Sequence, residues 1–391
     1  MKKIVIVNNN MRIGGVQKSL YNLLWSLEGR YEITLCLFRK DGVYADRLPN
    51  SVRVVETPGL FRYLGVAQQD CHGVDKVKRG FLAAFSRFFG RSKCMRILLA
   101  HEKTLPGKYD CAIAFLHNGR DESFYGGVQD YVLRRVNADR KIAFLHGDYR
   151  SCGANHKQNN RLIAEFDGIA ACSDGCRRAF EEVLPELSSK CVTVRNFHRF
   201  DEIRLLGDVD PVIYNDDCIH VVTVSRLSPE KGLDRAISAV AAAVSKGYRV
   251  RLHIVGGGVR ERELRDFAEQ TGASAFTEFH GEQENPYRYM KHADLLLLTS
   301  YHEAAPMVIE EAAVLGLPVL AAEFTSSKDM ITDVECGWVC ANAQEAITEA
   351  LETVISDKTA IVAMKAKLRA RAFDNTLAEK QFAEVANLDL Y

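Results

Sequence analysis

Short apolar runs alternate with segments of helical periodicity along most of the chain. Runs such as KIVIV at 3–7 and LLLL at 295–298 have the length of buried strands. Each precedes a polar loop and a stretch of apolar residues at helical spacing. A repeated order of buried strand, loop and helix predicts parallel sheets that are covered by helices. In sheets of this kind, ligands bind at the carboxyl ends of the strands.

The pattern divides the chain into two α/β domains. Strand–helix units occupy 1–200 and 217–372, and the segment 201–216 between them contains turn residues and several acids, as linkers do. A length of 391 residues suits two domains of ordinary size. We expect two Rossmann-like domains with mainly parallel sheets that face a central cleft.

One strand–loop–helix–strand unit carries the densest candidate chemistry. Its loop contains Glu303, Pro306 stands where a helix can begin, Glu311 lies one and a half turns into that helix, and Gly316 is expected to end it. The N–H groups of residues 304–308 can hold an anion, and carboxylates accept hydrogen bonds from hydroxyls. A nucleotide sugar presents both kinds of group. The spacing alone equally allows two solvated surface acids.

The string EAAPMVIEEAAVLGLPV at 303–319 resembles the E-x7-E signature of retaining glycosyltransferase family 4, the glycosyl transferases group 1, which has the GT-B fold. The resemblance spans nearly the whole chain and is densest from 221 to 337. Ala304 and Ala305 stand where the family usually has glycine and a large apolar residue, so this loop is expected to meet the donor sugar differently. The resemblance also implies that a C-terminal helix at 373–391 returns to the first domain.

Two cations lie in the strand–helix connection SRLSPEKG at 225–232. A diphosphate leaving group gains negative charge as the glycosidic bond breaks, and fixed cations stabilise that charge. The string is similar to the family's G-R-L-x-x-x-K-G, with Ser225 in place of glycine. This resemblance assigns Arg226 and Lys231 to the diphosphate, whereas two solvated loop cations would be the default interpretation of such a pair.

Glycine-rich loops follow two of the predicted strands. Gly14 and Gly15 follow the first strand, and Gly256 and Gly258 belong to a triple glycine after RLHIV. Glycine lets the backbone approach a ligand closely at a helix start. Neither loop has the G-x-G-x-x-G of dinucleotide-binding proteins. The first resembles the family's acceptor-side loop, and the second resembles a strand end near the nucleotide.

Two further predicted strands end in histidine, at His117 and His146. An imidazole at the ligand edge of a sheet can hydrogen-bond a sugar hydroxyl or a phosphate near neutral pH, and a structural histidine is the alternative. Family 4 enzymes often have a histidine where His146 stands, which implies contact with the transferred sugar. His117 has only its placement to support such a role. The segment around Asn196 resembles the point at which the family's chain crosses to its second domain.

The resemblance implies a role for each residue of the predicted site. Arg226 and Lys231 are expected to stabilise the departing diphosphate, Glu303 to orient the donor sugar, Glu311 to bind ribose hydroxyls, and His146 to contact the sugar from the other domain. The remaining donor-binding residues are expected to be Gly14, Gly15, Asn196, Gly256, Gly258, Ala304, Ala305, Pro306, Met307 and Val308.

The function implied by these residues is retaining sugar transfer. A sugar is expected to pass from a nucleotide diphosphate sugar, with UDP preferred by family frequency, to a glycan or lipid-linked acceptor in bacterial cell-surface polysaccharide synthesis. We predict no cofactor. We also predict no metal, because two cations and helix N–H groups can hold the phosphates, and Asp208 and Asp210, which have D-x-D spacing, lie in the predicted linker. A GT-B nucleotide-sugar epimerase and a non-catalytic nucleotide-sugar-binding protein stay open as alternatives.

Composition and charge narrow the partners and the compartment. Lys+Arg and Asp+Glu are both 51, so no net charge favours nucleic acid. Eleven scattered cysteines without a CxxC pair are typical of free thiols in a reducing cytoplasm and not of a zinc site. The apolar run near the N-terminus is too short for a signal core, and no stretch reaches the roughly 18 apolar residues of a membrane span. We expect a cytoplasmic protein, soluble or peripheral at the inner face of the plasma membrane.

Residues 74–103 differ from the rest of the chain in charge. They contain eight Lys or Arg and only two acids, Asp75 and Glu102. Aromatic and aliphatic residues recur among these cations at helical intervals, namely Phe81, Leu82, Phe85, Phe88 and Phe89. A basic amphipathic helix of this kind binds anionic membrane surfaces. The alternative is a helix whose apolar side faces the core and whose basic side is solvated.

Overall fold

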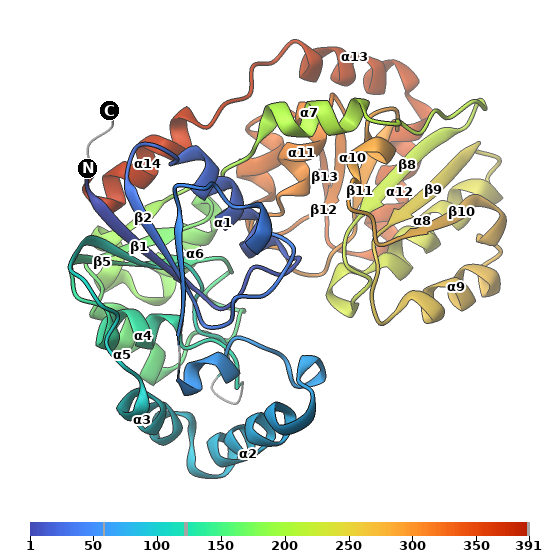
Figure 1. The fold of residues 1–391 in the computed structure, drawn as a ribbon. Helices are drawn as coiled ribbons and strands as arrows, with labels where there is room; N and C mark the ends of the chain where they lie inside the picture. Colours follow the sequence, from blue (N-terminus) through green and yellow to red (C-terminus); the bar gives the residue numbers. More distant parts are fainter. Residues whose placement is uncertain (58, 121–123, 389–391) are drawn as a thin grey trace. The chain divides into compact units, whose positions relative to one another are not determined.

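The computed structural model describes residues 1–57, 59–120 and 124–388, and these form two compact units (Figure 1). Unit 1 consists of Met1–Phe197 together with Asn375–Tyr391, and unit 2 consists of His198–Asp374. Each unit contains one sheet with helices packed on it. All strand pairings among the described residues are parallel, which confirms the predicted α/β class.

The sheet of unit 1 has seven strands in the order β3-β2-β1-β4-β5-β6-β7. The strands are β1 (Lys3–Asn8), β2 (Glu32–Leu37), β3 (Arg53–Glu56), β4 (Tyr109–Ala114), β5 (Ala138–Leu145), β6 (Gly168–Ala171) and β7 (Cys191–Thr193). Parallel strands covered on both faces read as continuous apolar runs, and Ile4 to Val7 are accordingly fully buried. The strand order reverses between β1 and β4, which is where a parallel sheet offers a ligand crevice.

Seven α-helices belong to the described part of unit 1. They are α1 (Gly15–Ser26), α2 (Gly73–Phe89), α3 (Arg91–His101), α4 (Val128–Arg135), α5 (Lys157–Ala164), α6 (Asp174–Val183) and α14 (Thr376–Ala386). Ser173 caps α6 by accepting a hydrogen bond from the Cys176 N–H at 3.0 Å. Residues 389–391 of the predicted C-terminal helix lie outside the described part of the chain.

Helix α14 completes the core of unit 1 although it is distant in sequence. Phe382 and Val385 lie in one buried cluster with Ile142 and Phe144 of β5. The Arg140 side chain donates to the Val385 carbonyl at 2.8 Å. The chain therefore leaves unit 1, forms the whole of unit 2 and returns.

The sheet of unit 2 has six strands in the order β10-β9-β8-β11-β12-β13. The strands are β8 (Ile219–Val224), β9 (Val250–Val255), β10 (Thr277–Gly281), β11 (Leu295–Leu298), β12 (Val319–Ala322) and β13 (Gly337–Cys340). The described helices of this unit are α7 (Phe200–Asp208), α8 (Leu233–Ser245), α9 (Glu261–Gln270), α10 (Tyr287–Met290), α11 (Val308–Val314), α12 (Gln344–Ser356) and α13 (Lys358–Arg369). Here the order reverses between β8 and β11.

The predicted linker 201–216 is wrong in its first half, because residues 200–208 form helix α7. Phe200 and Ile203 bury their side chains in the core of unit 2. The two acids with D-x-D spacing pair with cations of this unit, Asp208 with Lys291 at 3.0 Å and Asp210 with Arg288 at 2.5 Å. Composition indicated a turn-rich acidic segment, and the packing of its apolar residues makes it a helix.

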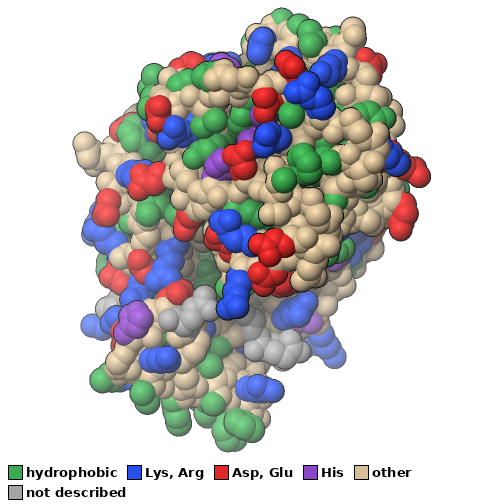
Figure 2. Space-filling model, turned by 90° about the vertical axis from the view of Figure 1, so that its right-hand side faces the viewer, with side chains coloured by type: hydrophobic (Ala, Val, Ile, Leu, Met, Phe, Trp, Pro, Cys, Tyr) green, Lys and Arg blue, Asp and Glu red, His purple; other side chains and the backbone are tan. Residues whose placement is uncertain are grey.

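The predicted basic helix 74–103 is two helices, α2 and α3, which meet at Gly90. Val74, Val77, Phe81 and Phe88 form a stripe at helical spacing along α2, and each is more than two-thirds exposed. Hydrophobic side chains and neighbouring Lys and Arg are visible at the lower end of Figure 2, where Figure 1 places α2. The alternative of a core-facing apolar side is therefore wrong for this stripe.

Two of the eight cations of this segment have structural roles. Arg79 is buried and donates to the Val66 and Phe124 carbonyls at 2.7 and 3.0 Å. Arg91 is also buried and donates to the Tyr125 carbonyl. None of the helices in the described residues is both long and apolar enough to cross a membrane.

Candidate functional site

Two loops meet at the carboxyl edge of the unit 2 sheet, where the strand order reverses. The loop after β8 and the loop after β11 are joined by backbone contacts. The Thr299 hydroxyl donates to the Gly232 carbonyl at 2.8 Å, and the Tyr301 N–H donates to the Glu230 carbonyl at 2.9 Å. Gly232 has a left-handed φ of +57°, and a Cβ there would lie 2.5 Å from the Thr299 oxygen. Glycine is needed at this crossing, which places Lys231 beside Glu303.

Lys231 and Glu303 form a partly buried ion pair. Lys231 Nζ lies 2.6 Å from Glu303 Oε1, and the Ser300 hydroxyl donates to the same oxygen at 2.8 Å. The two side chains are 18% and 12% exposed. Neither is a freely solvated loop residue, so the site presents one fixed cation and one fixed carboxylate side by side.

Arg226 lies on the same loop as Lys231 but is held differently. Its side chain is 67% exposed and reaches Glu230 Oε1 at 3.3 Å, while the Ser228 hydroxyl donates to that oxygen at 2.7 Å. This geometry matches the solvated-cation alternative for Arg226. The structure therefore brings only one of the two predicted phosphate cations against Glu303.

Glu311 is buried in helix α11 and is not a solvated surface acid. It is 8% exposed, and the Tyr287 hydroxyl donates to its Oε1 at 3.1 Å. The helix is shorter than predicted and begins at Val308. It ends as predicted, because the Gly316 and Leu317 N–H groups return to the carbonyls of the last turn at 3.0 and 2.9 Å.

A buried histidine that the sequence reading missed supports the loop before α11. His198 lies just after the crossing into unit 2, and its Nε2 is 3.3 Å from the Met307 carbonyl oxygen. Its Nδ1 is 3.1 Å from Glu310 Oε2. Burial lowers the pKa of His198, but the carboxylates of Glu310 and Glu311 outweigh it and leave the pKa above its ordinary value. Its only sequence signal is its position two residues after Asn196.

A second support was also missed, because its partners are distant in sequence. The buried Arg235 of α8 donates to the Thr299 carbonyl at 3.1 Å and to Asn342 Oδ1 at 2.7 Å. Its guanidinium lies 4.6 Å from the centre of the Tyr301 ring. The Asn342 amide in turn donates to the Glu323 carbonyl at 2.9 Å. These contacts fix the end of β11.

The predicted glycines after β9 are explained by packing of the two loops. Gly256 has φ +143°, and a Cβ there would lie 1.9 Å from the Ser225 carbonyl oxygen. A Cβ at Gly258 would lie 2.5 Å from the Leu227 oxygen. The Leu227 N–H also donates to the Gly257 carbonyl at 2.9 Å. Backbone of the loop after β8, and not only a ligand, requires glycine here.

In unit 1 the predicted residues Gly14 and Gly15 lie at the start of α1, next to the reversal between β1 and β4. A Cβ at Gly15 would meet nothing within 4 Å. A Cβ at Gly14 would meet only the Gln17 side chain within that distance, at 2.6 Å. The backbone here is accessible to a ligand, in contrast to Gly256 and Gly258.

His146 follows β5 and is packed under aromatic rings. Its ring centre lies 4.7 Å from that of Phe115, and its backbone N–H donates to His117 Nδ1 at 3.2 Å. Burial lowers the pKa of His146 to about 3 and that of His117 to about 4. Nε2 of His146 is buried without a hydrogen-bond partner among the described residues. A neutral ring with an unpaired nitrogen is a candidate ligand contact.

Asn196 lies beside the start of unit 2 and is tied to α1. The Ser19 hydroxyl donates to Asn196 Oδ1 at 2.8 Å. Among the predicted residues, the structure therefore forms two groups. At the carboxyl edge of its own sheet, unit 2 gathers Arg226, Lys231, Gly256, Gly258, Glu303, residues 304–308 and Glu311. At the carboxyl edge of its own sheet, unit 1 gathers Gly14, Gly15, His146 and Asn196.

Comparison with known proteins identifies similar sequences and folds. Residues 213–375 match the family model described as Glycosyl transferases group 1. The lipopolysaccharide glucosyltransferase WaaG of Escherichia coli is 34% identical over 128 residues, which are 32% of this chain and 34% of WaaG. A GDP-mannose-dependent phosphatidylinositol dimannoside mannosyltransferase of Mycobacterium tuberculosis is 31% identical over 202 residues, 51% of each chain. The chain thus spans between a third and a half of the length of these relatives.

The similarity of structure extends over the whole chain. The crystal structure of Anabaena Alr3699/HepE in complex with UDP and glucose superposes with a TM-score of 0.68 and covers 99% of this chain and 100% of HepE. Sequence identity in that superposition is 19%, so the likeness shows the fold alone. The fold is GT-B, as the sequence predicts.

Proposed function

We propose, since residues 213–375 match the glycosyl transferases group 1 family model, that this protein is a retaining glycosyltransferase. It moves a sugar from a nucleotide diphosphate sugar to a hydroxyl of a glycan or lipid-linked acceptor, in bacterial cell-surface polysaccharide synthesis. The observation that carries the proposal is the Lys231–Glu303 pair at the reversal of the unit 2 sheet. This is the place where a parallel sheet binds its ligand.

The side chains of unit 2 divide the donor between them. Lys231, held at the sheet edge, neutralises the charge that grows on the departing diphosphate, and the exposed Arg226 folds onto the same group. Glu303 accepts hydrogen bonds from hydroxyls of the transferred sugar. Glu311, held by Tyr287, accepts from the ribose hydroxyls. Phosphate binding by these cations requires no metal.

We assign His146 of unit 1 the role of a hydrogen-bond acceptor for a sugar hydroxyl. The Phe115 carbonyl interacts with the His146 ring, and a carbonyl oxygen can only accept a hydrogen bond, so the ring donates to it. Since Nε2 has no partner among the described residues, we assign the ring proton to Nδ1 and a free lone pair to Nε2. Nε2 therefore accepts a hydrogen bond from a sugar hydroxyl. Gly14 and Gly15 leave room for a ligand at the start of α1.

A UDP-hexose is the preferred donor. The HepE structure with the matching fold contains UDP and glucose, and WaaG is a glucosyltransferase. The mycobacterial relative depends on GDP-mannose, so the family admits a second base and sugar. Thermal melting against UDP, GDP, ADP and NAD separates these possibilities. A ligand that binds only the folded state at 100 times its Kd adds about 2.7 kcal/mol to stability.

The matched variants for this experiment are Lys231→Ala and Lys246→Ala. Lys246 is a surface cation paired with Glu352. Loss of a charge-assisted hydrogen bond of about 1.5–3 kcal/mol predicts that Lys231→Ala binds the diphosphate about 10- to 100-fold more weakly, and that Lys246→Ala binds it like the wild type. A melting shift with NAD alone contradicts the proposal. So does the absence of a shift with any of the nucleoside diphosphates.

Product analysis separates transfer from the two alternatives. A glycosyltransferase consumes the donor in proportion to acceptor and keeps the anomeric configuration. An epimerase converts the donor without an acceptor, and a binding protein leaves it unchanged. Because the proposed phosphate site needs no metal, we expect turnover to be unchanged after a chelator removes divalent ions. Loss of turnover under these conditions would exclude metal-independent phosphate binding.

The exposed stripe of α2 supports contact with an anionic membrane. Val74, Val77, Phe81 and Phe88 present one apolar side, and surface cations flank it. Transfer of each Phe side chain out of water contributes about 1.5–3 kcal/mol. Such contact would bring unit 1 to a lipid-linked acceptor at the inner face of the plasma membrane.

Co-sedimentation with liposomes that contain anionic lipid tests this contact. The double variant Phe81→Ser/Phe88→Ser is expected to bind at least about tenfold more weakly than the wild type. The control Val362→Ser removes an equally exposed apolar residue from α13 and is expected to change nothing. Binding of the wild type should also fall as salt rises. Absence of wild-type binding at low salt contradicts the proposal.

A further inference from the structure

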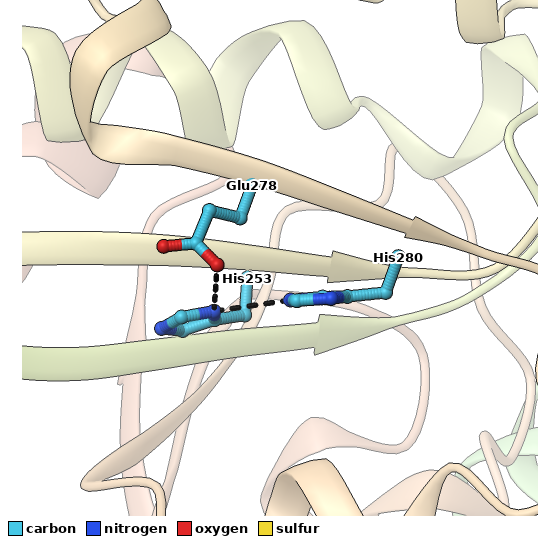
Figure 3. Close-up of side chains that lie close together, drawn as sticks. All are labelled: His253, Glu278 and His280. Atoms are coloured by element: carbon cyan, nitrogen blue, oxygen red, sulfur yellow. Dashed lines mark hydrogen bonds and ion pairs between the residues drawn. The ribbon is translucent and has the colours of Figure 1, made fainter. Parts of the chain in front are cut away.

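Three histidines lie side by side on one face of the unit 2 sheet. His220 belongs to β8, His253 to β9 and His280 to β10, and β10 is the edge strand. The rings stack with centres 5.2 and 5.4 Å apart. In the register of the sheet, His253 lies opposite Glu278, two residues before His280. The side chains of His253, Glu278 and His280 converge (Figure 3).

A hydrogen-bond chain fixes the protonation pattern of these rings. Asp216 Oδ1 lies 3.0 Å from His220 Nε2, and a carboxylate only accepts, so His220 carries its proton on Nε2. His220 Nδ1 is then an acceptor, and the N–H at His253 Nε2 donates a hydrogen bond to it at 2.9 Å. Nδ1 of His253 is left with a lone pair, which points toward His280 Nε2 at 3.1 Å.

The three converging atoms have the spacing of metal ligands. His253 Nδ1 lies 3.1 Å from His280 Nε2 and 3.8 Å from Glu278 Oε2, and one ligand atom from each residue lies within 4.8 Å of the others. Ligands at about 2.0–2.1 Å from a tetrahedral Zn²⁺ are about 3.3 Å apart. An ion at the centre requires only small side-chain movements.

We propose that His253 Nδ1, His280 Nε2 and the Glu278 carboxylate bind one divalent transition-metal ion, for which Zn²⁺ is the best fit. Imidazole nitrogens favour Zn²⁺ over Mg²⁺ and Ca²⁺, which prefer oxygen. The chain from His253 through His220 to Asp216 is the kind of outer support that orients metal-binding histidines. This site goes beyond the proposed sugar transfer and is not part of it.

Binding changes the tautomer of one ring and releases no net proton. Without the ion, the proton of His280 Nε2 lies between His280 and His253. With the ion, that proton moves to His280 Nδ1 through solvent, and Nε2 becomes a ligand. Glu278 is half exposed, so the fourth position of the ion is open to water.

The ion would join β9 to the edge strand β10, close to the loop after β9 that carries Gly256 and Gly258 of the candidate site. The Gly256 N–H donates to the Gly281 carbonyl at 2.8 Å, directly after the metal-binding positions. Binding therefore holds the ends of β9 and β10 together. It is expected to stabilise unit 2 by RT ln(1 + c/Kd), where c is the free Zn²⁺ concentration, which is about 1.4 kcal/mol for each tenfold rise of the free ion above its Kd.

Isothermal titration of the full-length, untagged and chelator-treated protein tests the site. We expect one Zn²⁺ per chain and no Mg²⁺ binding at the same concentrations. Glu278→Gln and His280→Gln change half-exposed edge-strand residues, and each is expected to weaken Zn²⁺ binding at least about tenfold. His101→Gln removes an exposed histidine of α3 and should bind like the wild type.

The visible spectrum of the Co²⁺-loaded protein gives a second readout that does not depend on activity. Strong d–d absorption of a four-coordinate ion is expected in the wild type and should be lost in His280→Gln. Thiolate charge-transfer bands would show that partly exposed cysteines such as Cys218 hold the ion instead. That result, or equal Zn²⁺ affinity of the wild type and His280→Gln, overturns the proposal.

Discussion

Lys231 and Glu303 are each other's partners in a largely water-shielded pair, so neither can be changed alone without a cost to the other. The Nζ–Oε1 distance is 2.6 Å, and both side chains are less than a fifth exposed. Removing one member of such a pair leaves a charge without compensation, whereas removing both charges is much less harmful. Stability and function can therefore be separated at this position.

The first prediction compares Lys231→Met, Glu303→Gln and the double variant. Each single change is expected to lower the free energy of unfolding by about 2 kcal/mol, because a charge-assisted hydrogen bond is lost. The double variant should recover most of that loss and still lack transferase activity. Urea unfolding and donor turnover measure the two effects. Additive losses in the double variant would show that the pair is not energetically coupled.

The second prediction concerns the pH dependence that His198 gives to unit 2. Burial lowers the pKa of His198, but the carboxylates of Glu310 and Glu311 outweigh this effect and raise the pKa in the folded protein above the ordinary value of 6.5. The folded state thus holds a proton that the unfolded state releases. The stabilisation is complete below about pH 6.5 and is lost as pH rises through the raised pKa.

Urea unfolding of the wild type and His198→Gln between pH 6 and pH 8.5 measures this contribution. The stability difference between them should be largest at pH 6 and shrink as pH rises. His101→Gln, which changes an exposed histidine, should show no such trend. A difference that is constant with pH would mean that the folded His198 does not titrate in this range.

The sequence predicts some residues of the site and misses others for a physical reason. Lys231 and Glu303 lie in contiguous strings, SRLSPEKG and EAAPMVIEE, so a local pattern identifies them. Arg235 works through Asn342, and the two are 107 residues apart. A contact between such distant residues leaves no local pattern. The solvated state of Arg226 likewise depends on its neighbours in space.

At the scale of elements, helical spacing predicts the existence of α2 but not its orientation. The periodicity of Val74, Val77, Phe81 and Phe88 is the same whether the stripe faces a core or solvent. The orientation of α2 is decided by Arg79, which is buried and donates hydrogen bonds to the Val66 and Phe124 carbonyls. A cation therefore faces the protein and apolar residues face outward, the reverse of a usual surface helix.

The third prediction tests the packing of the loops after β8 and β9. Gly256→Ala places a Cβ 1.9 Å from the Ser225 carbonyl at a φ of +143°, so the backbone must move. We expect a loss of at least about 2 kcal/mol in unfolding free energy. Gly80→Ala is the control, because Gly80 lies within α2 and a Cβ there makes only an ordinary contact at 3.5 Å.

In Gly80→Ala, a glycine inside a helix is replaced without a clash, so stability is expected to rise by about 0.5–1 kcal/mol. Thermal unfolding of both variants gives the comparison. Equal effects of the two substitutions would show that the loops of unit 2 can separate at little cost.

At the scale of the molecule, partly buried neutral histidines make unit 1 sensitive to acid. Burial lowers the pKa of His117 to about 4 and that of His146 to about 3. Between about pH 4 and 6.5 the unfolded chain binds protons that the folded one does not, so stability falls as pH falls. Each group contributes roughly 1.4 kcal/mol per pH unit in that window.

The fourth prediction is that unfolding free energy decreases from pH 6.5 to pH 5, and that His117→Gln makes this decrease shallower. Glutamine keeps a polar side chain and does not titrate. Denaturant unfolding followed across this range measures the slope. A variant with the same slope as the wild type would show that His117 is protonated in the folded protein.

The sequence predicts the architecture of the whole molecule more completely than it predicts where individual elements and domains begin and end. Buried apolar runs predict two parallel sheets because strands covered on both faces have no polar side. The segment 201–216 reads as a linker because its acids dominate, but Phe200 and Ile203 pack against unit 2 and make residues 200–208 a helix. Strand β13 is short and half-buried, so its pattern is weak.

The return of α14 to unit 1 imposes an order on how the two units are made. All of His198–Asp374 is synthesised before α14, so unit 2 is one uninterrupted segment that can close its core without any later part of the chain. Unit 1 has to wait with Ile142 and Phe144 uncovered until Phe382 and Val385 arrive. The segment translated first is thus the last to be finished, and during that interval it is the part of the nascent protein that needs protection from aggregation.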